Sequence, residues 1–354
     1  MGEPGKDQTG GSAVGSDRYS RQELFARIGP EGQRRLRGKH AFVLGAGALG
    51  TGNAELLVRA GVGRLTIVDR DYVEWSNLQR QQLYEEADAR DRLPKAAAAQ
   101  RRLQRLNGDV DVRGVVADVG PAELEELASG ADVLIDATDN FDARLLLNDF
   151  AVRQRLPWVY GACVGSYGTT LTIIPGETPC LSCLLESVPL GGATCDTVGV
   201  IAPVVQMVVA YQGAAALKLL VGDSEALNRK LISFDLWSNQ HTAIDVSRMK
   251  RPGCPTCGEH PTYPHLQPEQ QTRTAVLCGR DTVQLRPPAG AVRRDLAELA
   301  RALRRLGADV QANEFLVSFT AGSHRLVVFA DGRALVHGTK DVAEARSLYH
   351  KYLG

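Results

Sequence analysis

Apolar residues in the first half of this chain form short runs that alternate with a helical stretch. Two runs, Ala41–Leu44 and Leu65–Val68, have the length of strands, and a third run ends at Asp136. Between the first two, Asn53–Ala60 reads as a helix. Strands that alternate with helices are typical of a parallel sheet with helices on its faces. The pattern predicts an α/β fold with a Rossmann-like, doubly wound sheet.

A different pattern follows residue 273. Thr274–Leu285 reads as a strand region, and the apolar spacing from there to Gly307 is that of a helix with a glycine C-cap. Three further strands and a last helix are predicted at Phe315–Phe319, Leu326–Phe329, Ala334–Val336 and Asp341–Tyr352. We therefore expect residues 274–354 to form a small C-terminal α+β domain, joined by a linker, 259–273, to a larger domain, 17–258.

The first apolar run leads into a glycine loop, residues 45–50, where a strand ends and a helix begins. Backbone N–H groups and the helix dipole receive phosphates at such a place. Gly45 permits the tight turn, Gly47 lets the backbone approach a phosphate, and Gly50 allows close packing of helix on strand. Asp69 ends the second run nineteen residues past Gly50, where a carboxylate can accept both hydroxyls of a ribose. Together these residues predict a nucleotide site.

Polar and basic residues follow in the order that triphosphate chemistry requires. Asn77 and Arg80 come after the second run, Lys95 opens the next helix, and Asp139 follows the third run. Each also has a simpler interpretation: Arg80 and Lys95 as solvated surface charges, Asn77 as a turn former, and Asp139 as the N-cap of a helix. As a set behind a phosphate loop they favour a reaction that breaks the α–β phosphate bond, because the departing oxygens need Arg, Lys and Mg²⁺ nearby.

Four of the seven cysteines form two C-x-x-C pairs, Cys180/Cys183 and Cys254/Cys257, with seventy residues between them. Two such pairs are the pattern of a tetrahedral zinc site with four cysteine ligands, but zinc ribbons usually have a shorter spacing, so spacing alone leaves the question open. Cys195 stands alone in a loop of small residues. Two roles remain open for Cys195. It is either a reactive thiol that attacks an acyl-adenylate or exchanges sulfur, or a residue without a catalytic role.

Composition narrows the class of function. The 41 basic and 41 acidic residues balance, which argues against a nucleic-acid partner. Residues 1–16 are rich in Gly, Ser and charge, and read as a disordered tail without the apolar segment of a secretion signal. The apolar stretch Val198–Val221 is interrupted by a proline, two glutamines and a lysine, so it favours a buried helix over a membrane span. We expect a cytoplasmic enzyme.

Taken in order, these motifs resemble those of one family, the MoeB/ThiF adenylyltransferases, which are bacterial relatives of the ubiquitin-activating enzymes. The resemblance extends over about Arg18 to Cys257. It rests on residues 18–22 (RYSRQ), the glycine loop, Val68-Asp69, residues 76–81 (SNLQRQ), Pro94-Lys95, residues 137–140 (ATDN), residues 179–183 (PCLSC), Thr194-Cys195, residues 199–203 (GVIAP) and residues 254–257 (CPTC).

The resemblance implies ATP-dependent adenylation of the C-terminal glycine of a ubiquitin-like sulfur-carrier protein that ends in Gly-Gly, with release of pyrophosphate. The roles implied by matched position are phosphate binding by Gly45, Gly47 and Gly50, ribose binding by Asp69, triphosphate contacts by Asn77, Arg80 and Lys95, and Mg²⁺ binding by Asp139. The residue matching Arg21 reaches the ATP site of the partner subunit, which implies an obligate homodimer. The cysteine pairs are implied to hold a structural Zn²⁺.

The carrier stays open between a ThiS-like protein, for the thiazole of thiamine, and a MoaD-like protein, for molybdopterin. We lean to thiamine because residues 260–264 and the C-terminal segment look similar to extended ThiF-type proteins. That segment is expected to dock the carrier or another partner, and a persulfide sulfur donor is a further candidate partner. Two other functions fit the sequence less well. An NAD(P)-dependent oxidoreductase leaves Arg80, Lys95 and the cysteine pairs unexplained, and a non-catalytic scaffold predicts broken motifs.

Overall fold

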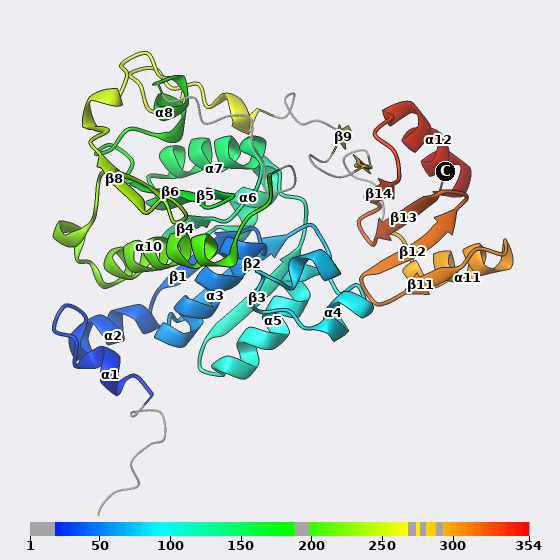
Figure 1. Ribbon diagram of the computed structural model, residues 1–354, viewed down its shortest axis with the longest axis horizontal. Coiled ribbons are helices and arrows are strands. Elements are labelled where there is room, and N and C mark those ends of the chain that lie inside the picture. Colours follow the sequence, from blue (N-terminus) through cyan, green and yellow to red (C-terminus); the bar gives the residue numbers. More distant parts are fainter. Residues whose placement is uncertain (1–17, 188–197, 268–273, 277–280, 288–292, 354) are drawn as a thin grey trace, which may run out of the picture.

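Two sheets organise the computed structural model, which describes residues 18–187, 198–267, 274–276, 281–287 and 293–353 (Figure 1). The larger sheet has the strand order β3-β2-β1-β4-β5-β6-β7-β8. The strands β3, β2, β1, β4 and β5 pair in parallel, as predicted, and β6, β7 and β8 extend the sheet antiparallel. The bounds are β1 His40–Leu44, β2 Arg64–Asp69, β3 Asp111–Val116, β4 Val133–Asp136, β5 Trp158–Val164, β6 Tyr167–Ile173, β7 Leu231–Asp235 and β8 Gln240–Ile244.

Helices cover both faces of the larger sheet, so the predicted α/β fold is confirmed. Helices α3, α5 and α10 pack on one face, and α6, α7 and α8 pack on the other. The helix bounds are α1 Ser20–Glu23, α2 Gly29–Arg37, α3 Ala48–Ala60, α4 Glu86–Arg90, α5 Lys95–Leu106, α6 Pro121–Leu127, α7 Phe141–Gln154, α8 Leu181–Ser187 and α10 Ala202–Val221. Short 3-10 helices lie at η1 Trp75–Asn77, η2 Ser224–Ala226, η3 Ser247–Met249 and η4 Pro264–Leu266.

Helix α10 is the apolar stretch singled out in the sequence. Within the described ranges it alone has the length and composition of a membrane span. Half of that stretch is buried inside the fold, where α10 contacts α3, β5 and β6. A core helix passes the same test, so α10 is weak evidence for a membrane segment.

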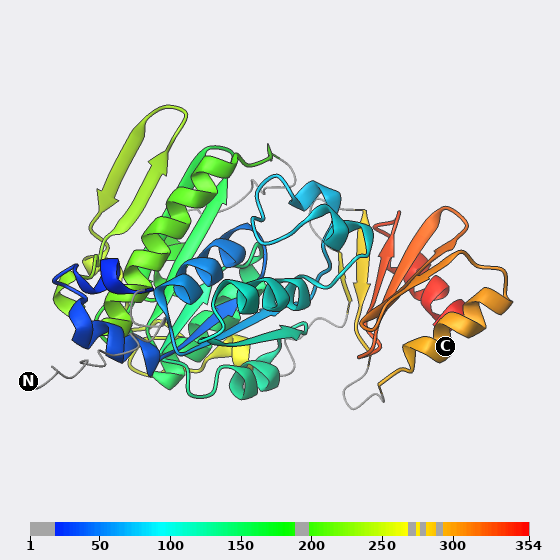
Figure 2. The same ribbon diagram turned by 90° about the horizontal axis from the view of Figure 1, so that it is seen from below.

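The smaller sheet is antiparallel throughout, with the strand order β11-β12-β13-β14-β10-β9. Its elements lie close to the predicted positions, except that residues 274–285 form two paired strands and β11 was not predicted. The bounds are β9 Thr274–Val276, β10 Thr282–Leu285, α11 Leu296–Arg305, β11 Val310–Ala312, β12 Leu316–Ala321, β13 His324–Phe329, β14 Ala334–His337 and α12 Val342–Leu353. Helices α11 and α12 cover one face, and the other face is turned toward the larger unit (Figure 2).

The domain boundaries at 17–258, 259–273 and 274–354 stay predictions, and residues 1–16 lie outside the described ranges. Part of the expected linker is packed on the larger unit. The backbone N–H of His265 donates to Asp149 Oδ2 at 2.8 Å, and Leu266 is buried beside α7.

Candidate active site and metal centre

The glycine loop lies at the carboxyl end of β1, and its three glycines meet different surroundings. A Cβ on Gly45 would lie 2.5 Å from the carbonyl oxygen of Ala137, and one on Gly50 would lie 1.9 Å from the carbonyl oxygen of Gly45. Gly45 also has a φ of +101°, which disfavours any other residue. A Cβ on Gly47 would meet nothing closer than Gln81 Nε2, at 3.9 Å. Packing therefore requires Gly45 and Gly50, whereas the space beside Gly47 is open to a ligand.

Asp69 ends β2 beside this loop. Its Oδ2 accepts from the backbone N–H of Ala46 at 2.6 Å, and its Oδ1 accepts from that of Asp71 at 2.7 Å. Burial raises the pKa of the Asp69 carboxyl, against the opposing charge of Lys95. A carboxylate has about four acceptor sites, so capacity for ribose hydroxyls remains.

Lys95 is the first residue of α5 and is buried, which excludes its interpretation as a solvated surface charge. Its Nζ lies 3.8 Å from Asp71 Oδ2. The Tyr84 hydroxyl donates to the carbonyl oxygen of Ala46, at 2.6 Å, and is 3.2 Å from that of Lys95. Lys95, Asp69 and the glycine loop are therefore brought together at one edge of the sheet.

Two buried amides beside the loop have unused polar atoms. Asn77 Oδ1 accepts from the backbone N–H of Glu74 at 3.0 Å, which agrees with a turn-forming role, but its Nδ2 has no partner in the described part of the chain. Gln81 Oε1 is likewise buried without a partner among the described residues. Arg80, between them, is partly exposed and bonds the carbonyl oxygen of Ser76 at 2.9 Å. Since buried polar groups in proteins are normally paired, these amides fit a bound polar ligand.

Asp139 lies exposed, three residues beyond β4. It is not the N-cap of α7, because Asn140 caps that helix with Oδ1 accepting from Ala143 N at 2.9 Å. Burial disfavours the charge on Arg70, but the carboxylates of Asp71, Asp118 and Asp139 outweigh this and raise the Arg70 pKa. Asp139 follows Ala137 and Thr138, whose backbone lies against Gly45, so it comes directly after a segment that packs on the glycine loop.

The sequence analysis missed Arg144, which holds the segment before Asp139. Its Nε lies 3.1 Å from Asp136 Oδ2, and its Nη2 donates to the carbonyl oxygen of Thr138 at 2.6 Å. Both charges are buried, so each needs the other. In the sequence, the signal for Arg144 is a charged residue on the inner side of the helix that follows the strand ending in Asp136.

Two predicted site residues are not brought to this edge. Arg21 is exposed on α1, next to Tyr19, whose ring lies against Gly61 at the far end of α3 from the glycine loop. The 13 residues of α3 span about 20 Å. Cys195 lies outside the described ranges.

The four cysteines of the two pairs converge. Their Sγ atoms all lie within 4.8 Å of one another, and three of the pairs are separated by 3.9, 3.6 and 3.5 Å. A tetrahedron with Zn–S bonds of about 2.3 Å has S–S edges of about 3.8 Å, so the set fits zinc. Burial raises the pKa of the Cys183 thiol to about 11, so a bound cation would favour the thiolate form of this residue.

Helix α7 supports this cluster. Asn148 Oδ1 accepts from the backbone N–H of Leu181 at 2.8 Å, and Asp149 Oδ1 accepts from the Thr256 hydroxyl at 2.6 Å. Thr256 also bonds Ser182 at 3.1 Å, so the two cysteine loops are tied to one helix and to each other. Ligand loops in protein metal sites are commonly fixed by outer hydrogen bonds of this kind.

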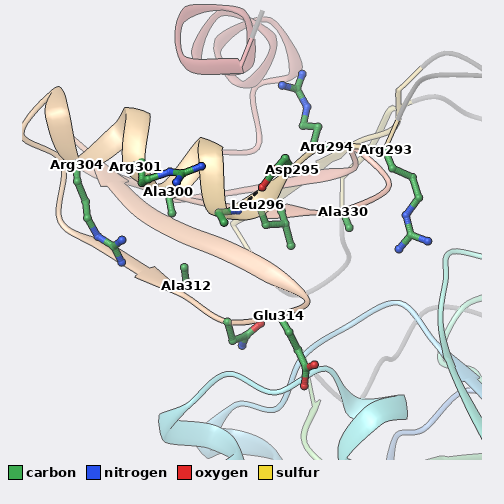
Figure 3. Close-up of a pocket in the computed structure, with 12 residues that line it drawn as sticks. Arg293, Arg294, Asp295, Leu296, Ala300, Arg301, Arg304, Ala312, Glu314 and Ala330 are labelled. Atoms are coloured by element: carbon green, nitrogen blue, oxygen red, sulfur yellow. Dashed lines mark hydrogen bonds between the residues drawn. The ribbon is translucent and has the colours of Figure 1, made fainter.

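A pocket of about 620 Å³ lies on the smaller unit, between α11 and β11 (Figure 3). Arginines dominate its polar lining, among them Arg293, Arg301 and Arg304. None of the predicted site residues lines it. The nucleotide site is therefore located by the glycine loop and its neighbours.

Comparison with known proteins agrees with this arrangement. The family model described as "ThiF family" matches residues 19–256. The chain is 54% identical over 337 residues, 95% of its length and 99% of the relative, to the sulfur carrier protein ThiS adenylyltransferase of Bacillus subtilis. It is 34% identical over 244 residues, 68% of its length and 96% of the relative, to the molybdopterin-synthase adenylyltransferase of Escherichia coli.

A solved structure shows the same fold at low sequence identity. The crystal structure of E. coli MccB with ATP superposes with a TM-score of 0.58 and 23% identity, over 68% of this chain and 74% of that chain. The resemblance inferred from the motifs is thereby confirmed by a family match that extends over most of the larger unit. The chain belongs to the ThiF family.

Proposed function

We propose that this chain adenylates the C-terminal glycine of a ubiquitin-like sulfur-carrier protein, using ATP and releasing pyrophosphate. The observation that carries the proposal is the meeting of an open glycine loop, a partly buried carboxylate and a buried lysine at one sheet edge, together with buried amides that have no partner among the described residues. The named activities of the two relatives support the same reaction. A ThiS-like carrier is the first candidate, because the relative with that name matches 95% of the chain.

The residues at this edge are suited to bind ATP with its α-phosphate nearest the C-terminus of the carrier. Gly45 and Gly50 shape the loop, Gly47 faces a phosphate, and Asp69 holds the ribose. Asn77 Nδ2 and the side chains of Arg80 and Lys95 contact the triphosphate. An NAD(P)-dependent oxidoreductase would not use these cations, and the intact set disfavours a scaffold without activity.

The reaction needs positioning and charge neutralisation more than proton transfer. A carboxylate oxygen of the carrier attacks the α-phosphorus, a new C(O)–O–P bond forms, and the bond to the β-phosphate oxygen breaks with its electron pair leaving on pyrophosphate. The carrier carboxylate is already ionised at neutral pH, so no general base is required. Fixed cations relieve the repulsion between nucleophile and polyanion.

Two metals fit the residues present. Asp139 is exposed beside the loop and could hold Mg²⁺, which supplies charge neutralisation on the phosphate oxygens. Cys180, Cys183, Cys254 and Cys257 would hold a closed, structural Zn²⁺.

Arg21, remote from its own site, would act in the site of a partner subunit in a homodimer. The proposal includes a catalytic Cys195, a persulfide sulfur donor as a further partner and a cytoplasmic location.

The test is carrier-dependent exchange of labelled pyrophosphate into ATP. Exchange should require a carrier that ends in Gly-Gly, and should disappear when that end is truncated. A titration of ThiS-like and MoaD-like carriers identifies the preferred one. Failure to exchange with every Gly-Gly carrier, or binding of NAD in preference to ATP, would overturn the proposal.

The glycine loop gives a prediction that separates folding from binding. Gly47→Ala should leave the free energy of unfolding unchanged but weaken ATP binding about tenfold, because a methyl group enters the open space. Gly50→Ala should instead destabilise the fold by at least about 1–3 kcal/mol through overpacking. Denaturant unfolding and ATP titration measure both. Equal loss of stability in the two variants would contradict the account.

The placement of Arg21 predicts complementation between subunits. Arg21→Ala and Arg80→Ala should each be inactive as homodimers. After mixing and subunit exchange, half of the dimers are mixed and each carries one complete site, so activity should return to about a quarter of the wild-type value. No recovery in dimers shown to have exchanged subunits would argue against a cation supplied by the partner.

A further inference from the structure

The smaller unit packs on the loops that carry the nucleotide site. One face of its sheet contributes Leu316, Val327, Phe329 and Leu335 to a buried cluster with Tyr72, and Val116 packs against the cluster. Tyr72 belongs to the segment 70–76, which joins Asp69 to Asn77. One face of the smaller unit's sheet is therefore occupied by the chain's own larger unit.

Arg333 fixes the backbone at the start of this segment. It is 1% exposed, its guanidinium lies 3.8 Å from the centre of the Phe329 ring, and its Nη2 donates to the carbonyl oxygen of Arg70 at 2.6 Å. Arg70 is the residue between Asp69 and Asp71. The contact thus holds the peptide that connects the expected ribose ligand to the partner of Lys95.

The rest of the segment is held in the same way. The Tyr72 hydroxyl lies 3.1 Å from His337 Nε2 and accepts from Arg325 Nη2 at 3.0 Å. Arg325 also lies 3.6 Å from Glu74. Since the backbone N–H of Glu74 anchors Asn77, this chain of contacts ends at a predicted triphosphate ligand.

The carboxylate of Asp118 contacts both units. Asp118 Oδ1 lies 3.3 Å from Arg70 Nη1, while its Oδ2 accepts from Gln284 and Arg286 of the smaller unit. Burial alone would raise the pKa of Asp118, but the guanidinium of Arg70, and then that of Arg286, outweigh it and hold the pKa below its usual value. The carboxylate is therefore charged and paired from both sides.

The segment before Lys95 is held by the same sheet. Gln311 and Asn313 donate to the carbonyl oxygens of Arg90 and Asp91, at 2.8 and 3.0 Å. Arg92 has a φ of +49°, rare for a residue other than glycine, and its Nη1 donates to Ser318 Oγ at 2.6 Å. A strained backbone next to Lys95 thus persists with support from the smaller unit.

The comparisons show that the smaller unit is an addition within the family. The E. coli molybdopterin-synthase adenylyltransferase is matched over 96% of its own length by 68% of this chain, whereas the B. subtilis relative matches 95% of this chain. The remainder of this chain therefore has no counterpart in the E. coli enzyme.

We propose that the smaller unit is a positioning element of the nucleotide site, and that Arg333 is its principal positioning residue. The proposal rests on the proposed function for the identity of the ligand, ATP. Arg333 touches neither nucleotide nor carrier. It acts through the backbone of Arg70, so its loss should weaken ATP binding and raise KM for ATP about tenfold, with little change in kcat or in KM for the carrier.

The test uses the full-length chain and a matched control. Arg294 also donates from Nη2 to a carbonyl oxygen at 2.6 Å, that of Leu353, and its guanidinium also lies over an aromatic ring, that of Tyr349, but both contacts stay within the smaller unit. Calorimetric binding of a non-hydrolysable ATP analogue with Mg²⁺ is compared for wild type, Arg333→Met, Arg333→Lys and Arg294→Met. We expect about tenfold weaker binding for Arg333→Met, partial recovery for Arg333→Lys and wild-type binding for Arg294→Met.

Unchanged binding by a folded Arg333→Met, or an equal loss for Arg294→Met, would overturn the proposal. If Arg333→Met does not fold, Tyr72→Phe tests the same interface from the larger unit by removing the hydroxyl between His337 and Arg325, and it should weaken binding about threefold. Unchanged binding there would count equally against the proposal. Because binding needs no carrier, a wild-type chain that binds the analogue without exchanging pyrophosphate would refute the proposed function alone.

Discussion

Arg80→Ala is expected to lower carrier-dependent ATP–pyrophosphate exchange about 10²–10³-fold, the usual cost of removing one group that stabilises transition-state charge. The free energy of unfolding should stay at the wild-type value, because Arg80 is partly exposed and, among the described residues, its guanidinium bonds only the nearby carbonyl oxygen of Ser76. Exchange rates and denaturant unfolding of the same preparation measure the two quantities.

Arg64 gives the matched control for Arg80. It is an exposed arginine at the first residue of β2, the opposite end of the strand from Asp69, and it pairs with Asp111 at 3.2 Å. Arg64→Ala should exchange at the wild-type rate. If Arg80→Ala keeps more than about a third of the wild-type rate, or if both variants lose activity alike, the triphosphate role of Arg80 is wrong.

Zinc removal is expected to have the largest effect on stability. Structural zinc can supply on the order of 10 kcal/mol of folding free energy, which is comparable to the whole stability of a typical domain. Cys254→Ser should therefore lose the bound zinc and the cooperative unfolding of the larger unit. Metal analysis of the purified protein and thermal unfolding provide the two measurements.

Cys163→Ser is the control, since Cys163 is half-buried and outside the four-cysteine cluster. It should keep one zinc per chain and the wild-type melting temperature. Should Cys254→Ser fail to fold, the wild-type protein answers the question, because a strong chelator should lower its melting temperature and added Zn²⁺ should restore it. Wild-type protein without zinc, or indifferent to chelation, would exclude a structural metal.

The sequence predicted those parts of the fold that local chemistry determines. The glycine loop marks the junction of β1 and α3, because Gly45 must adopt a positive φ and Gly50 must admit a backbone contact. The apolar runs predicted β1 and β2 because strands buried on both faces read as continuous apolar stretches. The spacing of the cysteines alone did not decide whether they could form a zinc site. The closeness of the four Sγ atoms in the structure provides the missing observation.

Other features depend on contacts between residues far apart in the chain, which no local pattern encodes. Lys95 could be read as a surface charge until its burial beside Asp71 was seen. Two partners of Asp118, Gln284 and Arg286, lie more than 160 residues away. The strands β6 to β8 pair antiparallel, and this direction depends on pairing between residues far apart in the chain.

Helix α7 contributes side chains to two sites, and the helix geometry sets the spacing between these side chains. Arg144 faces the nucleotide edge and Asn148, one turn later, faces the cysteine loops. One inserted residue between them would rotate the second side chain by about 100° around the axis relative to the first. Over the course of evolution the exposed residues of this stretch can vary freely, whereas its length is constrained by both sites at once.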